Sequence, residues 1–114
     1  MTETSKPHRR HGGERHQVTI SVQVSVLEGG GYAWFVGEAR DLSKTGVCLV
    51  LTRQLEKGTA VSMELAVPYN SQALAMRGIV RHRSGFHHGI EFISVTADQK
   101  EALERASKVL SLLS

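Results

Sequence analysis

The run Val18-Thr-Ile-Ser-Val-Gln-Val-Ser-Val26 decides the fold, because β-branched apolar residues alternate in it with polar ones. A period of two places one set of side chains on each face of an extended chain. Valine and isoleucine also suit a pleated, half-buried surface. The run therefore predicts a β-strand with one face against a hydrophobic core and the other in solvent.

Strand-like segments separated by turn residues continue from this run to residue 93. Gly29-Gly-Gly31 predicts a hairpin connection to a second strand over 32–40. Gly37 marks a candidate bulge or bend and Gly78 a candidate bulge, since a glycine inside a strand often lies at one. Further strands are expected at 47–52, 60–67, 73–83 and 86–93.

The hydrophobic period changes after the last of these strands. Thr96-Ala-Asp-Gln99 forms a capping box, in which the threonine hydroxyl and the glutamine side chain satisfy each other's free amides. We expect an all-β fold, a six-stranded antiparallel β-barrel with one C-terminal amphipathic helix over an opening or edge. Within this single domain we expect a flexible basic arm (1–17), the barrel (18–95) and the helix (96–114). The apolar stripe of the helix consists of Leu103, Ala106, Val109, Leu110 and Leu113.

The chain has 114 residues, 40% of them hydrophobic and 22% charged, which fits one ordinary domain with a single core. Cys48 is the only cysteine, so there is no disulfide framework and no Cys-rich zinc site. Its place in the apolar run 46–51 predicts a small core residue in a reducing compartment. No run reaches the ~18 apolar residues of a membrane span, and no signal-peptide pattern is present. We therefore expect a cytoplasmic protein.

The arm carries most of the excess positive charge. It contains four basic and two acidic residues, which give it a net charge of +2, compared with +3 for the whole chain. The arm has too few apolar residues to offset the entropy of ordering, so it is expected to be mobile until something binds it. Its basic residues are Lys6, Arg9, Arg10 and Arg15.

The turn Asp41-Leu-Ser-Lys-Thr-Gly46 interrupts two apolar runs and has two interpretations. In the first, Asp41 and Ser43 stabilise a strand connection through side-chain-to-backbone hydrogen bonds, and Gly46 supplies a backbone angle that other residues resist. In the second, the turn binds a ligand. A carboxylate accepts hydrogen bonds from guanine N1 and N2, and arginine forks match phosphate oxygens or guanine O6 and N7. Because glycine also allows close approach to a flat ligand, the arm and turn together suit a guanine nucleotide with phosphates.

Patterns for catalysis and metal binding are weak. Ser43 has no nucleophile elbow around it, and there is no glycosidase acid pair, Walker loop or dinucleotide fingerprint. If Ser84-Gly85 is a two-residue turn, His82 faces His87 across a hairpin, close enough to share an ion. A third ligand is lacking, so solvated strand histidines are the better interpretation. We expect neither an enzyme nor a metal site.

The turn matches the D/N-x-S-x-x-G motif of PilZ domains, the bacterial receptors for cyclic di-GMP. The resemblance extends from the arm to the end of the chain, through Gly58 before a strand, the segment His88-Gly89-Ile-Glu-Phe92 and a short helix. It implies a six-stranded antiparallel barrel with a terminal helix, in agreement with the strand pattern. It also implies a non-enzymatic receptor that binds this nucleotide without a further cofactor.

The family's upstream motif, R-x-x-x-R, is matched incompletely. Arg15 takes the place of the second arginine, but His11 lies four residues earlier, Arg10 five and Arg9 six. The arm has either gained a residue, with Gly12-Gly13 absorbing it, or lost an anchor. By position, the resemblance implies two arginine clamps on guanine and phosphates and a second group that holds a guanine edge. The clamps are Arg10, with Arg9 as a substitute, and Arg15; the edge group is Asp41, Ser43 and Gly46.

Our main hypothesis is a cyclic di-GMP receptor whose arm orders over the ligand and signals to an unidentified effector protein. We expect no DNA binding, no membrane insertion, and a monomer or weak dimer. The alternative is a degenerate PilZ-like module that binds protein and not the nucleotide. Nucleic-acid binding by the arm is disfavoured, because aromatic residues make up only 5% of the chain and no basic stripe recurs along a strand.

Overall fold

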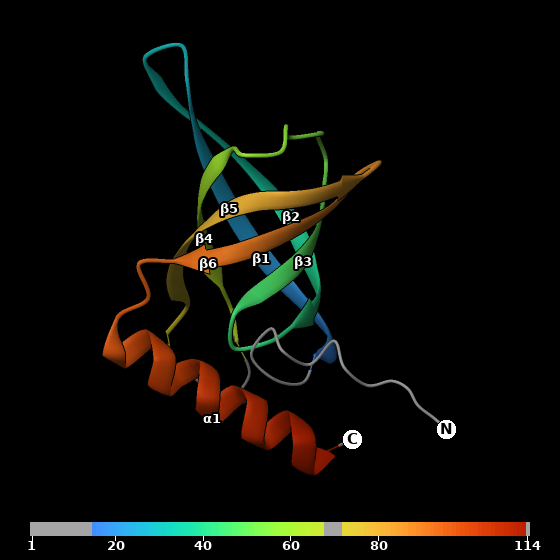
Figure 1. Ribbon diagram of the computed structural model, residues 1–114, viewed down its shortest axis with the longest axis vertical. Coiled ribbons are helices and arrows are strands. Elements are labelled where there is room, and N and C mark those ends of the chain that lie inside the picture. The colour runs from blue at the N-terminus through green and yellow to red at the C-terminus, as the bar shows by residue number, and fades with distance from the viewer. Residues whose placement is uncertain (1–14, 68–71, 114) are drawn as a thin grey trace.

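The computed structural model describes residues 15–67 and 72–113, and the structural statements below refer to these residues. The strands form one closed antiparallel barrel in the order β1-β2-β3-β6-β5-β4, with β4 pairing back onto β1 (Figure 1). A single helix lies across one end of the barrel, so the expected fold is confirmed. The elements are β1 (His16–Glu28), β2 (Gly31–Leu42), β3 (Gly46–Leu51), β4 (Ala60–Leu65), β5 (Leu74–Ser84), β6 (His87–Ile93) and α1 (Ala97–Leu113).

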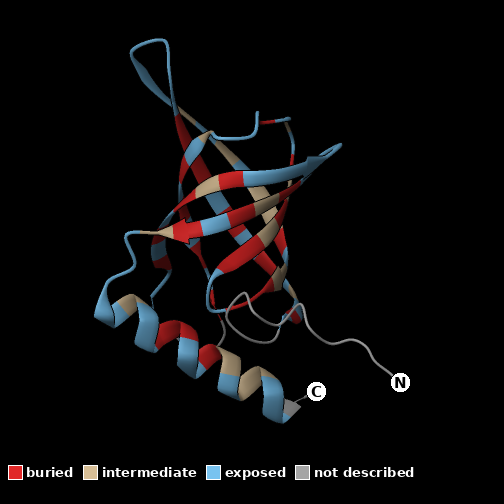
Figure 2. Cartoon of the chain, in the orientation of Figure 1, coloured by how far each residue is buried: buried red, intermediate tan, exposed pale blue. Residues whose placement is uncertain are grey.

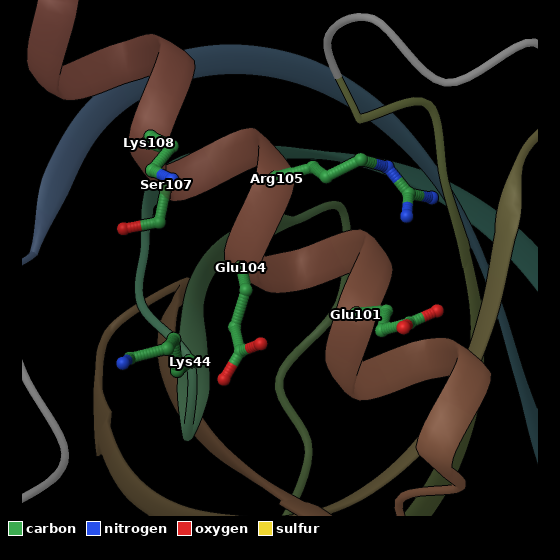
Figure 3. A pocket seen from close by; sticks show the side chains of 6 residues that line it. All are labelled: Lys44, Glu101, Glu104, Arg105, Ser107 and Lys108. Carbon is green, nitrogen blue, oxygen red and sulfur yellow. The ribbon is translucent and has the colours of Figure 1, made fainter.

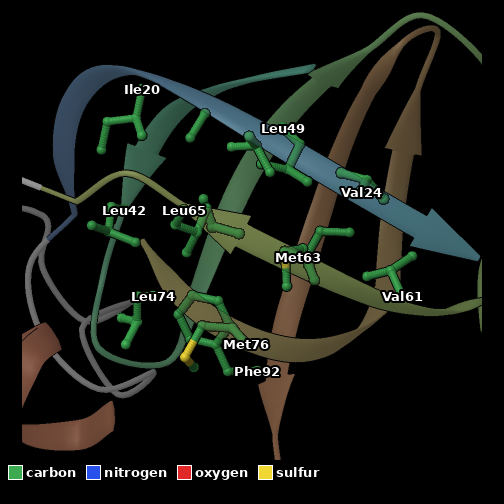
Figure 4. Packing of buried hydrophobic residues seen from close by; sticks show 14 of the residues in the cluster. Ile20, Val24, Leu42, Leu49, Val61, Met63, Leu65, Leu74, Met76 and Phe92 are labelled. Carbon is green, nitrogen blue, oxygen red and sulfur yellow. The ribbon is translucent and has the colours of Figure 1, made fainter. Parts of the chain in front are cut away.

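The barrel interior is filled by the inward-facing residues of every strand (Figures 2 and 4). In β1 the alternating set Ile20, Val22, Val24 and Val26 is at most 6% exposed, which confirms the period of two. The strand begins at His16, two residues before the expected start. Because the sheet is closed, the inward-facing side chains of all six strands meet in one core.

Gly37 and Gly78 do not lie at bulges, because the strand register runs without a shift through both. A Cβ on Gly37 would lie 2.5 Å from Leu51 Cδ2, and one on Gly78 would lie 2.4 Å from Ile90 Cγ2. These glycines therefore allow close packing against the neighbouring strands. The register shifts occur elsewhere, at Val18 and Thr19 in β1, at Arg40 in β2 and at Arg81 in β5.

The β1–β2 hairpin extends beyond the body of the barrel (Figure 1). Glu28 pairs with Gly31, and the two loop residues Gly29 and Gly30 have φ values of +54° and +83°. Positive φ at both central positions is the signature of a type I′ turn, whose twist matches that of the strands. The predicted glycine hairpin is thus confirmed.

The β5–β6 turn differs from the prediction by one residue. Ser84 pairs with His87, so the loop residues are Gly85 and Phe86, and His82 pairs with Gly89. The predicted pairing of His82 with His87 is therefore wrong. Gly85 has a φ of +61°, and a two-residue hairpin loop favours such a glycine at its first central position. Among residues 15–67 and 72–113, no group of three metal-ligating side chains comes together.

His88, on β6, is completely buried and serves the barrel wall. Its Nε2 accepts a hydrogen bond from the Leu55 N–H at 2.9 Å, which requires this nitrogen to be unprotonated. The proton must then be on Nδ1, which donates to the Phe86 carbonyl at 2.9 Å. Burial lowers the pKa of His88, and the positive charge of Arg83 adds to this effect. The ring therefore joins β6 to the β3–β4 connection as a neutral tautomer.

The predicted capping box begins α1. The Thr96 N–H donates to Gln99 Oε1 at 2.8 Å, and the Gln99 N–H donates to Thr96 Oγ1 at 3.1 Å. The amide of Gln99 also donates to the Ala75 carbonyl, which fixes the start of the helix to β5. Leu103 and Ala106 are buried, as expected from their spacing. No helix in the described part of the chain is long and apolar enough to cross a membrane.

Candidate functional site

The candidate site lies at the end of the barrel where β1 begins and the β2–β3 turn closes. Gln17 and Asp41 are cross-strand partners, so Arg15, just before β1, comes next to the acidic end of β2. The Arg15 guanidinium donates through Nη1 to Asp41 Oδ1. The last residue of the arginine motif is therefore in direct contact with the first residue of the D-x-S-x-x-G turn.

Both members of this ion pair face solvent. The Arg15 side chain is 57% exposed and the Asp41 side chain 30% exposed. An exposed pair of this kind contributes only ~0–1 kcal/mol to stability, because water screens the attraction and two side chains lose freedom. A ligand can therefore separate the two groups at small cost.

Ser43 has a different environment, since it is only 5% exposed. Its hydroxyl oxygen accepts the N–H groups of Gly46 at 3.2 Å and Thr45 at 3.3 Å. The Ser43 N–H in turn donates to the Gly46 carbonyl at 2.9 Å. These bonds close the turn around the serine, so Ser43 fixes the path of the backbone that follows Asp41.

Gly46 is required by the barrel itself. A Cβ at this position would lie 2.4 Å from the Ile90 carbonyl oxygen on β6, a distance that no real side chain tolerates. The predicted special backbone angle is wrong, because Gly46 is not among the residues with positive φ. The Phe92 N–H also donates to the Thr45 carbonyl at 2.9 Å. Close approach of β6 therefore explains the glycine and holds the turn rigidly.

The first arginine of the motif lies outside the described residues. Arg9 and Arg10 both precede residue 15, so the geometry of their contacts with the turn stays a prediction. Of the predicted ligand-binding residues, the structure brings together Arg15, Asp41, Ser43 and Gly46.

Cys48 was expected in the core, and this prediction is wrong because the residue is only half-buried. Val47 and Leu49 point inward, so strict alternation along β3 places the thiol on the outer face. There it is the cross-strand partner of Asp41. Burial raises the pKa of the Cys48 thiol, and the Asp41 carboxylate raises it further. The same alternation, applied to 47–52, would have identified this neighbour of the site.

Helix α1 is the second neighbour that the sequence did not indicate. His16, at the start of β1, is hydrogen-bonded through Nε2 to Ser107 Oγ at 3.0 Å. An open groove of about 550 Å³ separates the helix from the turn (Figure 3). The groove therefore combines the middle of the site motif with one face of the helix. Its lining residues are Lys44, Glu101, Glu104, Arg105, Ser107 and Lys108.

Three similar solved structures share this fold. The PilZ domain of CeSA from a cellulose-synthesizing bacterium is 18% identical, with a TM-score of 0.67, and the match covers 87% of this chain and 99% of that chain. The PilZ domain of YcgR from Escherichia coli with c-di-GMP is 15% identical, with a TM-score of 0.70 and 92% coverage of each chain. The inhibitor of motility MotI/DgrA from Bacillus subtilis is 16% identical, with a TM-score of 0.69; the match covers 86% of this chain but 49% of that chain.

At these identities the structural likeness shows the fold alone. A comparison with curated proteins returned no match. The sequence model of the PilZ domain, however, matches residues 7–108, a range that includes both the arginine motif and the D-x-S-x-x-G turn. The chain therefore belongs to the PilZ domain family, a family of cyclic di-GMP receptors.

Proposed function

We propose that this domain is a non-enzymatic cytoplasmic receptor that binds cyclic di-GMP at the Arg15–Asp41 end of the barrel. The observation that carries the proposal is the exposed contact between these two residues, which joins the two halves of the ligand motif. An acceptor for the guanine edge and a fork for phosphate oxygens are thus already adjacent before any ligand arrives.

Each residue of the proposed site has a distinct task. The Asp41 carboxylate accepts the N1–H and N2–H groups of one guanine. Arg15 turns from Asp41 to a phosphate or to guanine O6 and N7, and Arg10, with Arg9 as a substitute, closes from the arm. Ser43 and Gly46 hold the backbone of the turn so that a flat base can lie along it.

The energies favour this exchange of partners. The exposed Arg15–Asp41 pair is worth ~0–1 kcal/mol, whereas each charge-assisted hydrogen bond to the ligand contributes ~1.5–3 kcal/mol. Two such bonds compensate for the lost pair and leave a surplus toward ordering the arm. Loss of one bond weakens binding by roughly tenfold to a hundredfold, since ~1.4 kcal/mol is a factor of ten.

The proposed signal is the ordering of the arm. Residues 1–14 would fold over the bound nucleotide and present a new surface to an effector protein. His16 links the base of β1 to Ser107 of α1, so the helix next to the site is in position to sense this change. DNA binding and membrane insertion have no part in the proposal.

Isothermal titration calorimetry of the intact chain with cyclic di-GMP tests the proposal. We expect saturable heat, weakened at least tenfold by Asp41→Ala and by Arg15→Ala. Arg53→Ala is the control, because Arg53 forms an exposed ion pair with Glu28 at the opposite end of β1 from the site. Cyclic di-AMP should bind much more weakly, since adenine presents a ring-nitrogen acceptor where guanine presents N1–H. Absence of heat at high-micromolar cyclic di-GMP would overturn the proposal.

A further inference from the structure

The projecting β1–β2 hairpin carries a row of exposed apolar side chains on its outer face, which we call the hairpin stripe. Leu27 and Tyr32 are cross-strand partners, and Trp34 and Val36 follow at every second position of β2. Because alternate residues point to the same face, these four side chains form one continuous surface. They are 68%, 69%, 61% and 61% exposed, in that order.

The opposite face of the hairpin explains why the stripe is unusual. Ala33 and Phe35 are the inward residues of the same segment, and both pack against the core. The strand therefore has apolar residues on both faces, although only one faces the barrel. A contiguous exposed apolar surface that includes two aromatic residues is typical of a protein-interaction site.

Ion pairs lie at both ends of the stripe. Arg53 donates to Glu28 at the hairpin tip, and its guanidinium lies 5.1 Å from the centre of the Phe35 ring. Arg40 pairs with Glu38 at 2.7 Å at the other end of the stripe. The stripe is thus apolar along its length, with an ion pair at each end. Two identical copies can meet there without like-charge repulsion, which most charged surfaces could not do.

We propose that the hairpin stripe is the contact surface of a homodimer. A two-fold axis near Trp34 places each indole against its counterpart and each Tyr32 against the counterpart of Val36. Aromatic pairs and aromatic–β-branched pairs are favourable contacts between strands. The stripe therefore complements itself in the antiparallel orientation that a two-fold axis imposes.

The available area makes this a weak dimer. With ~150–250 Å² per aromatic side chain, the two aromatics at nearly two-thirds exposure offer about 250 Å², and the whole stripe on the order of 400 Å². Two copies bury roughly 800 Å² from the stripe and about 1,000 Å² with its polar border, at the low end of specific interfaces. Association is therefore expected in the micromolar range.

Dimerisation through the stripe leaves the proposed nucleotide site open. Within β1, Gln17 is the partner of Asp41 at the site, and Leu27 is the partner of Tyr32 in the stripe. Ten residues of strand, at ~3.3 Å each, separate the two places by about 30 Å. The dimer would thus present two ligand sites at its outer ends.

The experiment is sedimentation equilibrium of the intact chain without nucleotide, so its result is independent of ligand binding. We expect the average mass to rise above 12.5 kDa toward twice that value as concentration increases to about 100 µM. Trp34 is the only tryptophan, so its fluorescence reports on the stripe directly. Its emission should shift to shorter wavelength over the same concentration range.

Val36→Lys keeps the tryptophan and places a lysine ammonium group in the apolar contact with Tyr32 of the other copy, where it loses its hydration. It should give a monomer with emission that does not depend on concentration. Val36→Thr, which keeps a β-branched residue, should weaken association in the same direction. Phe86→Lys is the matched control, because Phe86 is a 49% exposed apolar residue on the β5–β6 turn. A monomer at every concentration, an effect of Phe86→Lys equal to that of Val36→Lys, or dimers that persist in both Val36 variants would overturn the proposal.

Discussion

Replacing Gly46 by alanine tests whether the motif glycine is required for the stability of the barrel in the absence of any ligand. The new methyl group would lie 2.4 Å from the Ile90 carbonyl oxygen and 3.5 Å from the Ile90 carbonyl carbon. Ordinary carbon–oxygen contacts are at least ~3.3 Å, so β3 or β6 must move by about 1 Å. Both strands are bonded on either side of this point, because Gly46 pairs with Glu91 and Thr45 accepts from Phe92. The shift therefore disturbs the ladder as well as the contact.

Overpacking of this kind costs ~1–3 kcal/mol. For a domain of about this size, 1 kcal/mol lowers Tm by roughly 4–8 °C, so Gly46→Ala should lower it by about 10 °C without any ligand. Gly31→Ala is the matched control, since its Cβ would meet nothing within 4 Å and its φ is not positive. Thermal unfolding followed by circular dichroism measures both. A Gly46→Ala protein that melts together with Gly31→Ala would refute the explanation of this glycine.

Three further predictions concern single residues. Ser43→Ala should lower the free energy of unfolding by ~1–3 kcal/mol in urea titrations, because the buried turn amides lose their acceptor, whereas Ser62→Ala on the exposed face of β4 should change little. Arg15→Ala should alter that free energy by at most ~1 kcal/mol while it weakens nucleotide binding. A variant that lost binding through unfolding would instead show a large loss of stability. His88 has a lowered folded-state pKa, so its contribution to stability is complete above about pH 6.5 and is lost as the pH falls toward that folded-state value. Urea midpoints at about pH 7.5 and 5.5 should therefore differ less for His88→Gln than for the wild type, and the exposed-site control His87→Gln should keep the full difference.

Features that depend on local periodicity could be predicted from the sequence. Alternation over 18–26, the glycine hairpin and the Thr96–Gln99 capping box all follow from residues close together in the chain. The errors over the strand glycines involve contacts between distant segments. Whether Gly37 forms a bulge or makes room for Leu51 depends on what β3 places against it, which no local pattern contains. The β5–β6 turn lies one residue later than expected, and the register of the same hairpin shifts again at Arg81, a bulge that the sequence pattern did not indicate.

In the candidate site, too, local patterns identified residues, whereas contacts between distant segments determined their roles. The letters of the motif indicated Asp41, Ser43 and Gly46, but their physical roles differ in ways that only the packed barrel reveals. Contact between Arg15 and Asp41 follows from the pairing of β1 with β2, because Gln17, two residues after Arg15, is the cross-strand partner of Asp41. The position of α1 beside the turn likewise involves residues far apart in the sequence, as in the hydrogen bond between His16 and Ser107.

These different roles also separate the two functional hypotheses. A degenerate barrel that had lost its ligand would still need Ser43 to close the turn and Gly46 to allow the close approach of β6. Those two residues therefore cannot distinguish a receptor from a degenerate module. Asp41 and Arg15 can, since their exposed pair contributes at most ~1 kcal/mol and the fold would tolerate many other residues there. The chain nevertheless places a carboxylate and a guanidinium side by side where β1 begins. Because stability does not account for that combination, it favours the receptor over the degenerate module.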